Sequence, residues 1–330
     1  NSIAMNDALK GRIIWALFDG EGDHPPAALK ALCRELVNEQ RASWADFNNA
    51  CDSLRTMKTR DIQCSGFSIR LLYNPVRSVN TLAAVTPEKI SERPCFLCAA
   101  NLPLEQKAIM YRGDFLILAN PRPILPFHLT IAHRAHRPQS IYDGMDQFLR
   151  ITMDIGPDFT TLYNGPRCGA SAPDHLHFQA VPSGKMPIEK EFGIKGKFSL
   201  LSATDNITIS SGRGLGRKII LIEGSRTGDV CTAFRESIDT LKAHTGQSEE
   251  PMINVIGHYN NTFYLAIFPR RAHRPAAFYR EDDHRILVSP AVVEMGGIIV
   301  TPSETDFNRL DASIIEAMYR EVSLMPKRKS

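Results

Sequence analysis

Hydrophobic positions first follow a helical period along the chain and then alternate with polar ones. Residues 26–54 repeat apolar side chains about every third or fourth position, which predicts one or two amphipathic helices covering the main fold. Short apolar runs separated by Pro, Gly and Asn follow, and they predict strands at 67–73, 81–85, 108–111, 115–119 and 128–132. These runs are typical of an antiparallel sheet.

The remaining pattern contains similar elements twice. A helix is expected at 140–155, followed by strands at 160–164 and 175–181. After a polar stretch come a strand at 218–222, a helix at 231–244, strands at 252–256, 262–269, 286–288 and 297–300, and a helix at 303–324. We therefore predict an α+β fold with two similar halves, divided into an N-terminal helical segment (1–60), a domain at 61–185 and a second domain at 186–330.

Charge and hydropathy exclude several classes of partner. The 39 basic and 36 acidic residues give a formal charge of +3 and form no long basic tract, which argues against nucleic acid and is compatible with a small anionic substrate. No apolar run approaches the ~20 residues that span a bilayer, and the amphipathic start at 9–18 lacks the cleavage site of a signal peptide. The expected location is the cytoplasm, without a membrane partner.

The seven cysteines are odd in number and scattered, which argues against a disulfide framework. Only Cys95 and Cys98 have an informative spacing, because Cys-x-x-Cys places two thiols on one tight turn. Two further ligands would complete a tetrahedral metal site. Redox chemistry or chance remain alternatives for this pair.

Residues 174–179 alternate polar and apolar side chains. On a strand this alternation places His175, His177 and Gln179 on one face. An exposed polar strand is the ordinary alternative, but the preceding turn at 164–171 supplies glycines together with amide, hydroxyl and guanidinium donors that suit phosphate oxygens. A neutral imidazole is a competent nucleophile at phosphorus near neutral pH.

Several motifs resemble the histidine-triad superfamily, in the branch that holds galactose-1-phosphate uridylyltransferase, diadenosine tetraphosphate phosphorylase and the GDP-hexose phosphorylases. The resemblance lies in Tyr73-Asn74-Pro75, in residues 93–101, in Asn164, Gly169 and Ser171, in His175-Leu176-His177-Phe178-Gln179, and in segments at 289–296 and 320–324. It implies an antiparallel sheet with flanking helices in each half. One departure is Asp174, which places the first histidine four positions after Ser171 instead of three.

By this resemblance His177 is the nucleophile that forms a covalent nucleotidyl-histidine. Gln179, Asn164, Gly169 and Ser171 then contact the transferred phosphate, and Arg167 is a candidate for neutralising its charge. Hydrolytic relatives have a third histidine where Gln179 stands, and Gln cannot titrate. Transfer to a second phosphate acceptor is therefore expected to replace hydrolysis.

The resemblance also supplies partners for the two cysteines. In zinc-bearing relatives the other ligands match His136 and His175 here, with His133 as the competitor of His136. Such a closed site implies a structural zinc that orients the histidine strand.

We therefore expect a nucleotidyltransferase or phosphorylase that acts on a nucleoside diphosphate sugar, with GDP-hexose leading, and passes the nucleotide to phosphate or a sugar phosphate. The alternatives are a dinucleoside polyphosphate phosphorylase or adenylyltransferase, a zinc-stabilised nucleotide-binding protein without turnover, and a redox protein using Cys95 and Cys98. A monomer and a homodimer are both compatible with the sequence. For Arg270, Arg271 and Arg274 a solvated charged edge is favoured over contact with a phosphate, and Gly212, Gly214 and Gly216 are assigned to a loop.

Overall fold

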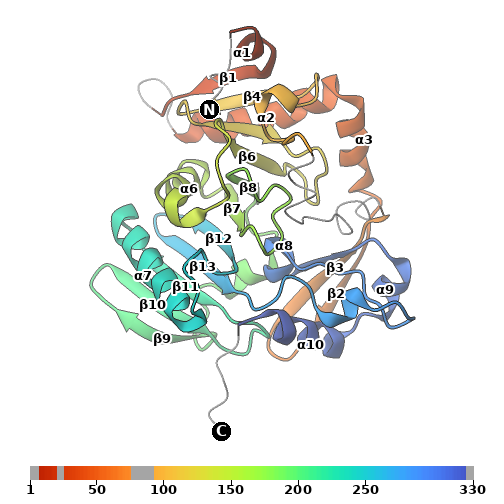
Figure 1. Ribbon diagram of the computed structural model, residues 1–330, viewed down its shortest axis with the longest axis vertical. Helices are drawn as coiled ribbons and strands as arrows, with labels where there is room; N and C mark the ends of the chain where they lie inside the picture. The colour runs from red at the N-terminus through yellow and green to blue at the C-terminus, as the bar shows by residue number, and fades with distance from the viewer. Residues whose placement is uncertain (1–6, 21–25, 76–92, 325–330) are drawn as a thin grey trace.

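The computed structural model describes residues 7–20, 26–75 and 93–324, so the predicted strand at 81–85 lies outside it. Figure 1 shows a large sheet crossing the molecule, with helices packed on one face and a small sheet with further helices on the other. No helix within the described ranges is both long and apolar enough to cross a membrane.

Eleven strands of the described chain form the large sheet, in the order β1-β4-β5-β6-β8-β7-β12-β13-β11-β10-β9. Their bounds are β1 Ile14–Phe18, β4 Ala108–Tyr111, β5 Phe115–Ala119, β6 Leu129–His133, β7 Phe159–Asn164, β8 His177–Pro182, β9 Phe198–Ala203, β10 Ile207–Gly212, β11 Ile220–Gly224, β12 Ile253–Tyr259 and β13 Phe263–Pro269. All neighbouring strands run antiparallel except β1 and β4, which are parallel.

The strand order repeats. In the first half β4-β5-β6-β8-β7 are neighbours and helix α6 (Ile141–Ile155) connects β6 to β7; in the second half β9-β10-β11-β13-β12 are neighbours and helix α7 (Thr227–Thr245) connects β11 to β12. The halves meet where β7 and β12 pair antiparallel, with Leu162 opposite Ile256. The predicted α+β class with two similar halves is confirmed, and the two halves share one continuous sheet.

Helices cover one face of this sheet. Besides α6 and α7 they are α2 Pro26–Ser43 and α3 Ala45–Ser53. Helix α1 (Asp7–Ile13) packs on the opposite face, where Ile13 is buried with Met110 and Leu116. Leu29 and Leu36 of α2, Phe148 of α6 and Phe234 of α7 are buried in one core with Phe178 of β8, because each helix turns an apolar stripe to the sheet. The predicted cover of amphipathic N-terminal helices is therefore present.

A second core lies on the opposite face. There a three-stranded sheet in the order β14-β3-β2 packs with three helices; the bounds are β2 Lys58–Gln63, β3 Ser68–Tyr73, β14 Ile298–Thr301, α8 Val292–Met295, α9 Glu304–Arg309 and α10 Ala312–Val322. Leu162, Val181 and Ile256 from the large sheet are buried in this core. Strand β3 was expected in the main antiparallel sheet, but it pairs in parallel with β14 near the end of the chain.

Other expected elements also differ. The predicted helix at 303–324 is two helices, because Asp311 caps the start of α10 by accepting a hydrogen bond from Ile314 N. Residues 286–288 are not a strand, and β1, β2, β9 and β10 were not expected. Strand β9 does not show the alternation of apolar and polar residues that predicts a strand, because it lies at the sheet edge and most of its side chains are exposed. Gly214 and Gly216 lie in a loop as expected, both with positive φ, but Gly212 was wrongly assigned to it and is the last residue of β10.

A carboxylate from the second half holds the start of helix α6. Glu250 Oε2 accepts hydrogen bonds from the backbone N–H groups of Ile141 (2.8 Å) and Tyr142 (3.0 Å), and its Oε1 accepts one from the Tyr163 hydroxyl at 2.5 Å. The preceding Ser140 makes no side-chain cap of its own. Glu250 therefore satisfies free N–H groups and places negative charge at the positive end of the helix.

Replacing Glu250 with Ala should lower the free energy of unfolding by about 2–3 kcal/mol, because buried N–H groups of α6 and the Tyr163 hydroxyl lose a charged acceptor. Urea denaturation measures this loss. Glu249→Ala, at an exposed neighbouring position, is the control and should change stability little. Equal effects of the two substitutions would contradict the capping role.

Candidate functional site

Strand β8 presents His177 and Gln179 to the face that carries the small sheet. Phe178 and Ala180 of this strand are buried in the helix-side core, whereas Val181 is buried in the opposite core, so the odd-numbered positions face the small sheet. His175 was expected on the same strand, but it lies in the turn before β8 and is fully buried.

The His177 ring is oriented by a backbone carbonyl. His177 Nδ1 lies 2.8 Å from the carbonyl oxygen of His175, and because a carbonyl can only accept, Nδ1 carries the proton and Nε2 keeps its lone pair. Burial lowers the pKa of His177 below its usual value, so the imidazole is neutral at neutral pH. Among the described residues, no hydrogen bond occupies Nε2.

Gln139 fixes the backbone on which His177 stands. Its Nε2 donates to the carbonyl oxygens of Asn164 (2.9 Å) and His177 (3.0 Å), and its Oε1 accepts from His177 N at 2.8 Å. The side chain is buried and thus ties the end of β7 to the start of β8. Sequence reasoning did not single out Gln139, because the two segments it joins lie 25 and 38 residues away.

His128 holds Gln179. Ile124 N approaches His128 Nδ1 at 3.4 Å, and since a backbone N–H only donates, Nδ1 is the acceptor and Nε2 bears the proton. His128 Nε2 then donates to Gln179 Oε1 at 2.8 Å. This hydrogen bond orients the Gln179 amide with its oxygen towards His128 and its NH₂ group away from His128. The sequence pattern indicated only the start of a strand at His128.

The turn at 164–171 is closed by the second half of the chain. Asn164 Oδ1 accepts hydrogen bonds from Asn254 Nδ2 (2.8 Å) and from Val292 N (2.7 Å), the first residue of α8. Gly169 has φ +111°, and a Cβ there would come within 2.5 Å of Ala291 Cβ, so only glycine fits. The turn is thus pressed against the start of α8.

The other predicted residues of the turn lie further out. Ser171 is exposed, and its carbonyl accepts a hydrogen bond from Arg93 Nη2 at 2.7 Å. Arg167 Nη2 donates to Gln247 Oε1 (2.9 Å) and to the Glu250 carbonyl (3.0 Å), so its guanidinium faces the second half.

Arg270 is not on a solvated edge. It is 3% exposed, and it donates to Asn254 Oδ1 and to the carbonyls of Pro290, Ala272 and His273. Burial lowers its pKa from the usual value. Arg270 thereby fixes the Asn254 amide, which in turn orients Asn164. The expectation of a solvated cluster was wrong for this residue, because folding surrounds it with acceptors from both neighbouring and distant residues, including Asn254 and Pro290.

A second group of side chains gathers Cys95, Cys98, His136 and His175, whose ligand atoms all lie within 4.8 Å of one another. Cys95 Sγ is 3.3 Å from His175 Nδ1, while Cys98 Sγ is 3.3 Å from His136 Nδ1 and 3.7 Å from His175 Nδ1. A tetrahedral ion with Zn-like bond lengths requires about 3.3–3.8 Å between its ligand atoms. These four residues are therefore placed to hold a metal ion.

The surroundings of the two histidines suit metal binding through Nδ1. His175 Nε2 lies 2.7 Å from the His133 carbonyl and must donate to it, and His136 Nε2 lies 3.6 Å from Asp174 Oδ2. Burial lowers the pKa of His175 to about 4, which keeps its ring neutral. Burial and then the adjacent Cys95 raise the pKa of the Cys98 thiol to about 11, so thiolates here need a cation.

His133, the competitor of His136, lies outside this group. Its ring packs edge-on against Phe115, and its Nδ1 lies 3.0 Å from Ala135 N. Asp174, the residue that departs from the relatives' spacing, faces His136.

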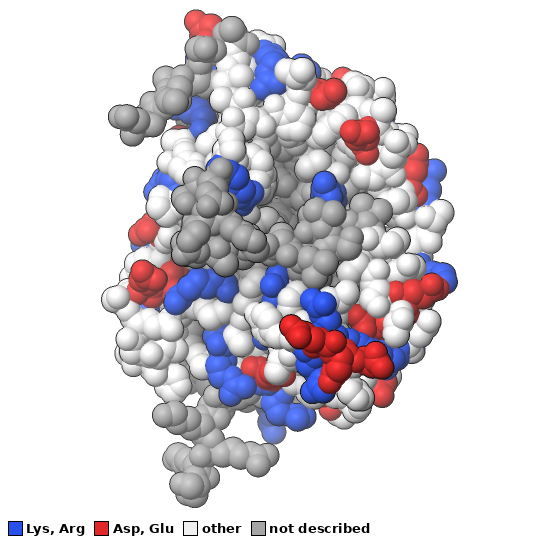
Figure 2. All heavy atoms as spheres, turned by 45° about the vertical axis from the view of Figure 1, so that its right-hand side comes forward, with Lys and Arg blue, Asp and Glu red and all other residues white. Residues whose placement is uncertain are grey.

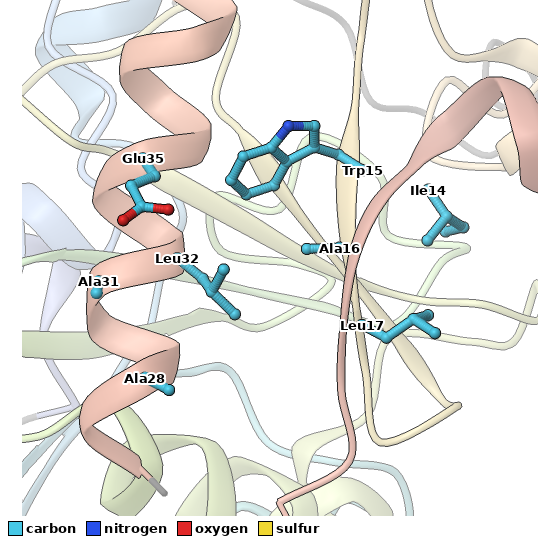
Figure 3. Close-up of a pocket in the computed structure, with 8 residues that line it drawn as sticks. All are labelled: Ile14, Trp15, Ala16, Leu17, Ala28, Ala31, Leu32 and Glu35. Carbon is cyan, nitrogen blue, oxygen red and sulfur yellow. The ribbon is translucent and has the colours of Figure 1, made fainter. Parts of the chain in front are cut away.

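A hollow of about 740 Å³ lies elsewhere, between β1 and α2. Figure 3 shows Trp15 and Leu17 on the strand opposite Leu32 and Glu35 on the helix. None of the predicted site residues lines it. The hollow is therefore separate from the histidine strand.

Comparison with known proteins places the fold. Three crystal structures of yeast Ap4A phosphorylase Apa2 are similar: free (12% identity, TM-score 0.60, 88% of this chain and 97% of that chain), with Ap4A (11%, 0.60, 89% and 97%) and with AMP (12%, 0.57, 89% and 99%). A family model described as a domain of unknown function (DUF4922) matches residues 36–182. No curated protein matches in sequence. The chain has the fold of an Ap4A phosphorylase, which confirms the architecture implied by the histidine-triad resemblance.

Titration with Co²⁺, whose absorption reports tetrahedral thiolate coordination, should show one ion per chain. His136→Ala should weaken binding at least tenfold because one ligand is lost, whereas the control His133→Ala should leave the spectrum nearly unchanged. The reverse result would exclude His136 as a ligand and favour His133.

Proposed function

We propose that this protein is a nucleotidyl-transferring enzyme, a phosphorylase or nucleotidyltransferase that works through a covalent nucleotidyl-His177. The observation that carries the proposal is the His177 tautomer. Its protonated Nδ1 is held by the His175 carbonyl, so a neutral Nε2 with a free lone pair is set on the strand face beside Gln179.

In the first step Nε2 of His177 attacks the α-phosphorus of the nucleotide. The P–N bond forms as the bond from phosphorus to the leaving phosphate oxygen breaks, and that oxygen keeps the electron pair. The imidazole becomes positively charged, and the hydrogen bond from Nδ1 to the His175 carbonyl favours that state.

In the second step an oxygen of inorganic phosphate or of a sugar phosphate attacks the same phosphorus. The P–N bond breaks and its electron pair returns to Nε2, which regenerates neutral His177. Gln179 cannot deliver or remove a proton, so an acceptor that is already ionised is favoured over water. The two displacements define a ping-pong mechanism.

The turn at 164–171 would bind the transferred phosphate. Asn254 and Val292 occupy Oδ1 of Asn164, and no described residue accepts from its NH₂ group, which can therefore donate to a phosphate oxygen. Gly169 and Ser171 lie on the same turn and are proposed as further contacts. Arg167 is proposed to secure the turn to the second half through Gln247.

Two substrate classes compete. A GDP-hexose is favoured by the motif His175–Ala180, which resembles the GDP-hexose phosphorylases. A dinucleoside polyphosphate is favoured by similarity along 89% of the chain to yeast Ap4A phosphorylase Apa2 in complex with Ap4A. The leaving group would be hexose 1-phosphate in the first case and ATP in the second, and phosphorolysis would release GDP or ADP.

We propose that the metal held by Cys95, Cys98, His136 and His175 is zinc, since two thiolates and two imidazoles in tetrahedral spacing are a typical zinc set. Four protein ligands leave no position for a bound water, so its role is structural: it fixes the turn that leads into His177. Elemental analysis of the purified protein should find about one zinc per chain.

The test is to incubate the protein separately with α-³²P-labelled Ap4A, GDP-glucose, UDP-glucose and ATP, and to quench without acid. Base-stable label on the protein that added phosphate discharges is expected from one substrate class, and the labelled product names the base. His177→Ala should lose labelling by at least a thousandfold, because the nucleophile is absent.

His177→Ala must still melt as the wild type does and contain zinc for this loss to count. Tight binding of a nucleotide without any label, in folded zinc-containing protein, would instead support a binding protein without turnover and would exclude the covalent intermediate.

His128→Phe should slow labelling about 10–100-fold, because Gln179 loses the hydrogen bond that fixes its amide beside the phosphate. The measurement is a single-turnover rate at saturating substrate. His244→Phe, on the exposed side of α7, is the control. An unchanged rate in His128→Phe would show that the His128 contact does not position Gln179 for the reaction.

A further inference from the structure

A cavity of about 480 Å³ lies between the N-terminal helices and the small sheet. Its walls come from the ends of α2 and α3, from β2, β3 and β14, and from the loop at 124–127. This volume is within the usual range of small-molecule pockets. His177, Gln179 and the metal-binding residues are not among its lining residues.

The cavity combines an apolar floor with a basic rim. Leu54, Met57, Leu125 and Phe127 are among its apolar side chains, and most of its exposed lining is apolar. Its charged side chains are all cationic: they are Arg41, Arg55, Arg70 and Lys185. No lining residue is acidic, so the lining favours an anionic ligand over a cation.

Within the described residues, two of these cations are the least neutralised. Arg41 donates to Asp52 at 2.7 Å and Arg70 to Asp61 at 3.0 Å, so both have close carboxylates. Arg55 is 75% exposed and reaches Asp52 only at 3.8 Å, where Arg41 already binds. For Lys185, an exposed side chain, the described residues supply no ion pair. Arg55 and Lys185 can therefore form ion pairs with an anion bound at this rim.

Figure 2 turns the side that carries α3 and β2 towards the viewer. Lys and Arg side chains lie on several sides of its central part, and a large group of Asp and Glu side chains lies below and to the right of it. A positive field around an apolar recess attracts small anions and selects against cations.

We propose that this cavity binds a small molecule with an anionic group and an apolar body, at a site separate from the histidine strand. The anionic group lies between Arg55 and Lys185, and the apolar body rests on Met57 and Leu125. A neutral apolar molecule fits less well because it gains no charge-assisted contact with these two cations.

The probe is 8-anilinonaphthalene-1-sulfonate, whose fluorescence rises in apolar surroundings, with N-phenyl-1-naphthylamine as its uncharged analogue. Calorimetry and fluorescence should give one sulfonate per chain. The double variant Arg55→Glu with Lys185→Glu should weaken sulfonate binding at least tenfold and change binding of the uncharged analogue less than twofold.

The matched control is Arg226→Glu with Lys195→Glu, two exposed cations that do not line the cavity. It should leave sulfonate binding unchanged. Met57→Trp, which fills the cavity without changing charge, should weaken binding of both probes. Sulfonate binding that survives both Met57→Trp and the rim variant, or that falls equally in the matched control, would overturn the proposal. Neither readout depends on labelling of His177.

Discussion

The antiparallel pairing of β7 with β12 is the contact on which the rest of the molecule depends. Its backbone hydrogen bonds join the two halves into one sheet, and both cores take side chains from its strands. The pairing also brings Asn164 opposite Asn254. Buried polar groups in a sheet need hydrogen-bond partners, and Arg270, Val292 and the Cys168 carbonyl supply them for the Asn254 amide and for the Asn164 oxygen.

His175, one of the four residues placed to hold a metal ion, is separated from the proposed nucleophile His177 by one residue. The backbone carbonyl of His175 fixes the His177 ring, and the His175 ring is itself fixed by the His133 carbonyl on one nitrogen and by the cysteines on the other. Displacement of the His175 ring would therefore shift the carbonyl that sets the His177 tautomer. A metal ion held by these four residues would in this way orient His177 without contacting it.

The features that the sequence predicted correctly are those that depend on residues close together along the chain. Alternation at 174–179 placed His177 and Gln179 on one strand face, and the spacing of Cys95 and Cys98 indicated a metal turn; the resemblance added His136 and His175, which lie beside these cysteines in the structure. The α+β class and the repeat followed from periodicity.

The features that the sequence did not predict depend on contacts between residues far apart along the chain. The pairing of β3 with β14 joins segments more than 220 residues apart, and no local pattern announces it. Gln139, His128 and Asn254 look like ordinary polar residues until their partners are known. From the sequence Arg270 is taken for a surface charge because Arg271 follows it, yet it is buried beside Asn254 Oδ1 and the Pro290 carbonyl, which only folding brings near.

The hydrogen bond between Asn164 and Asn254 also constrains how the protein can evolve. The two residues are 90 positions apart, one in each half, and a change at either leaves a buried amide without its partner. The two halves therefore cannot change independently at these positions, and substitutions of Asn164 and Asn254 should occur together in related sequences. The second half, which lacks the proposed nucleophile, must therefore keep Asn254 for as long as the first half keeps Asn164.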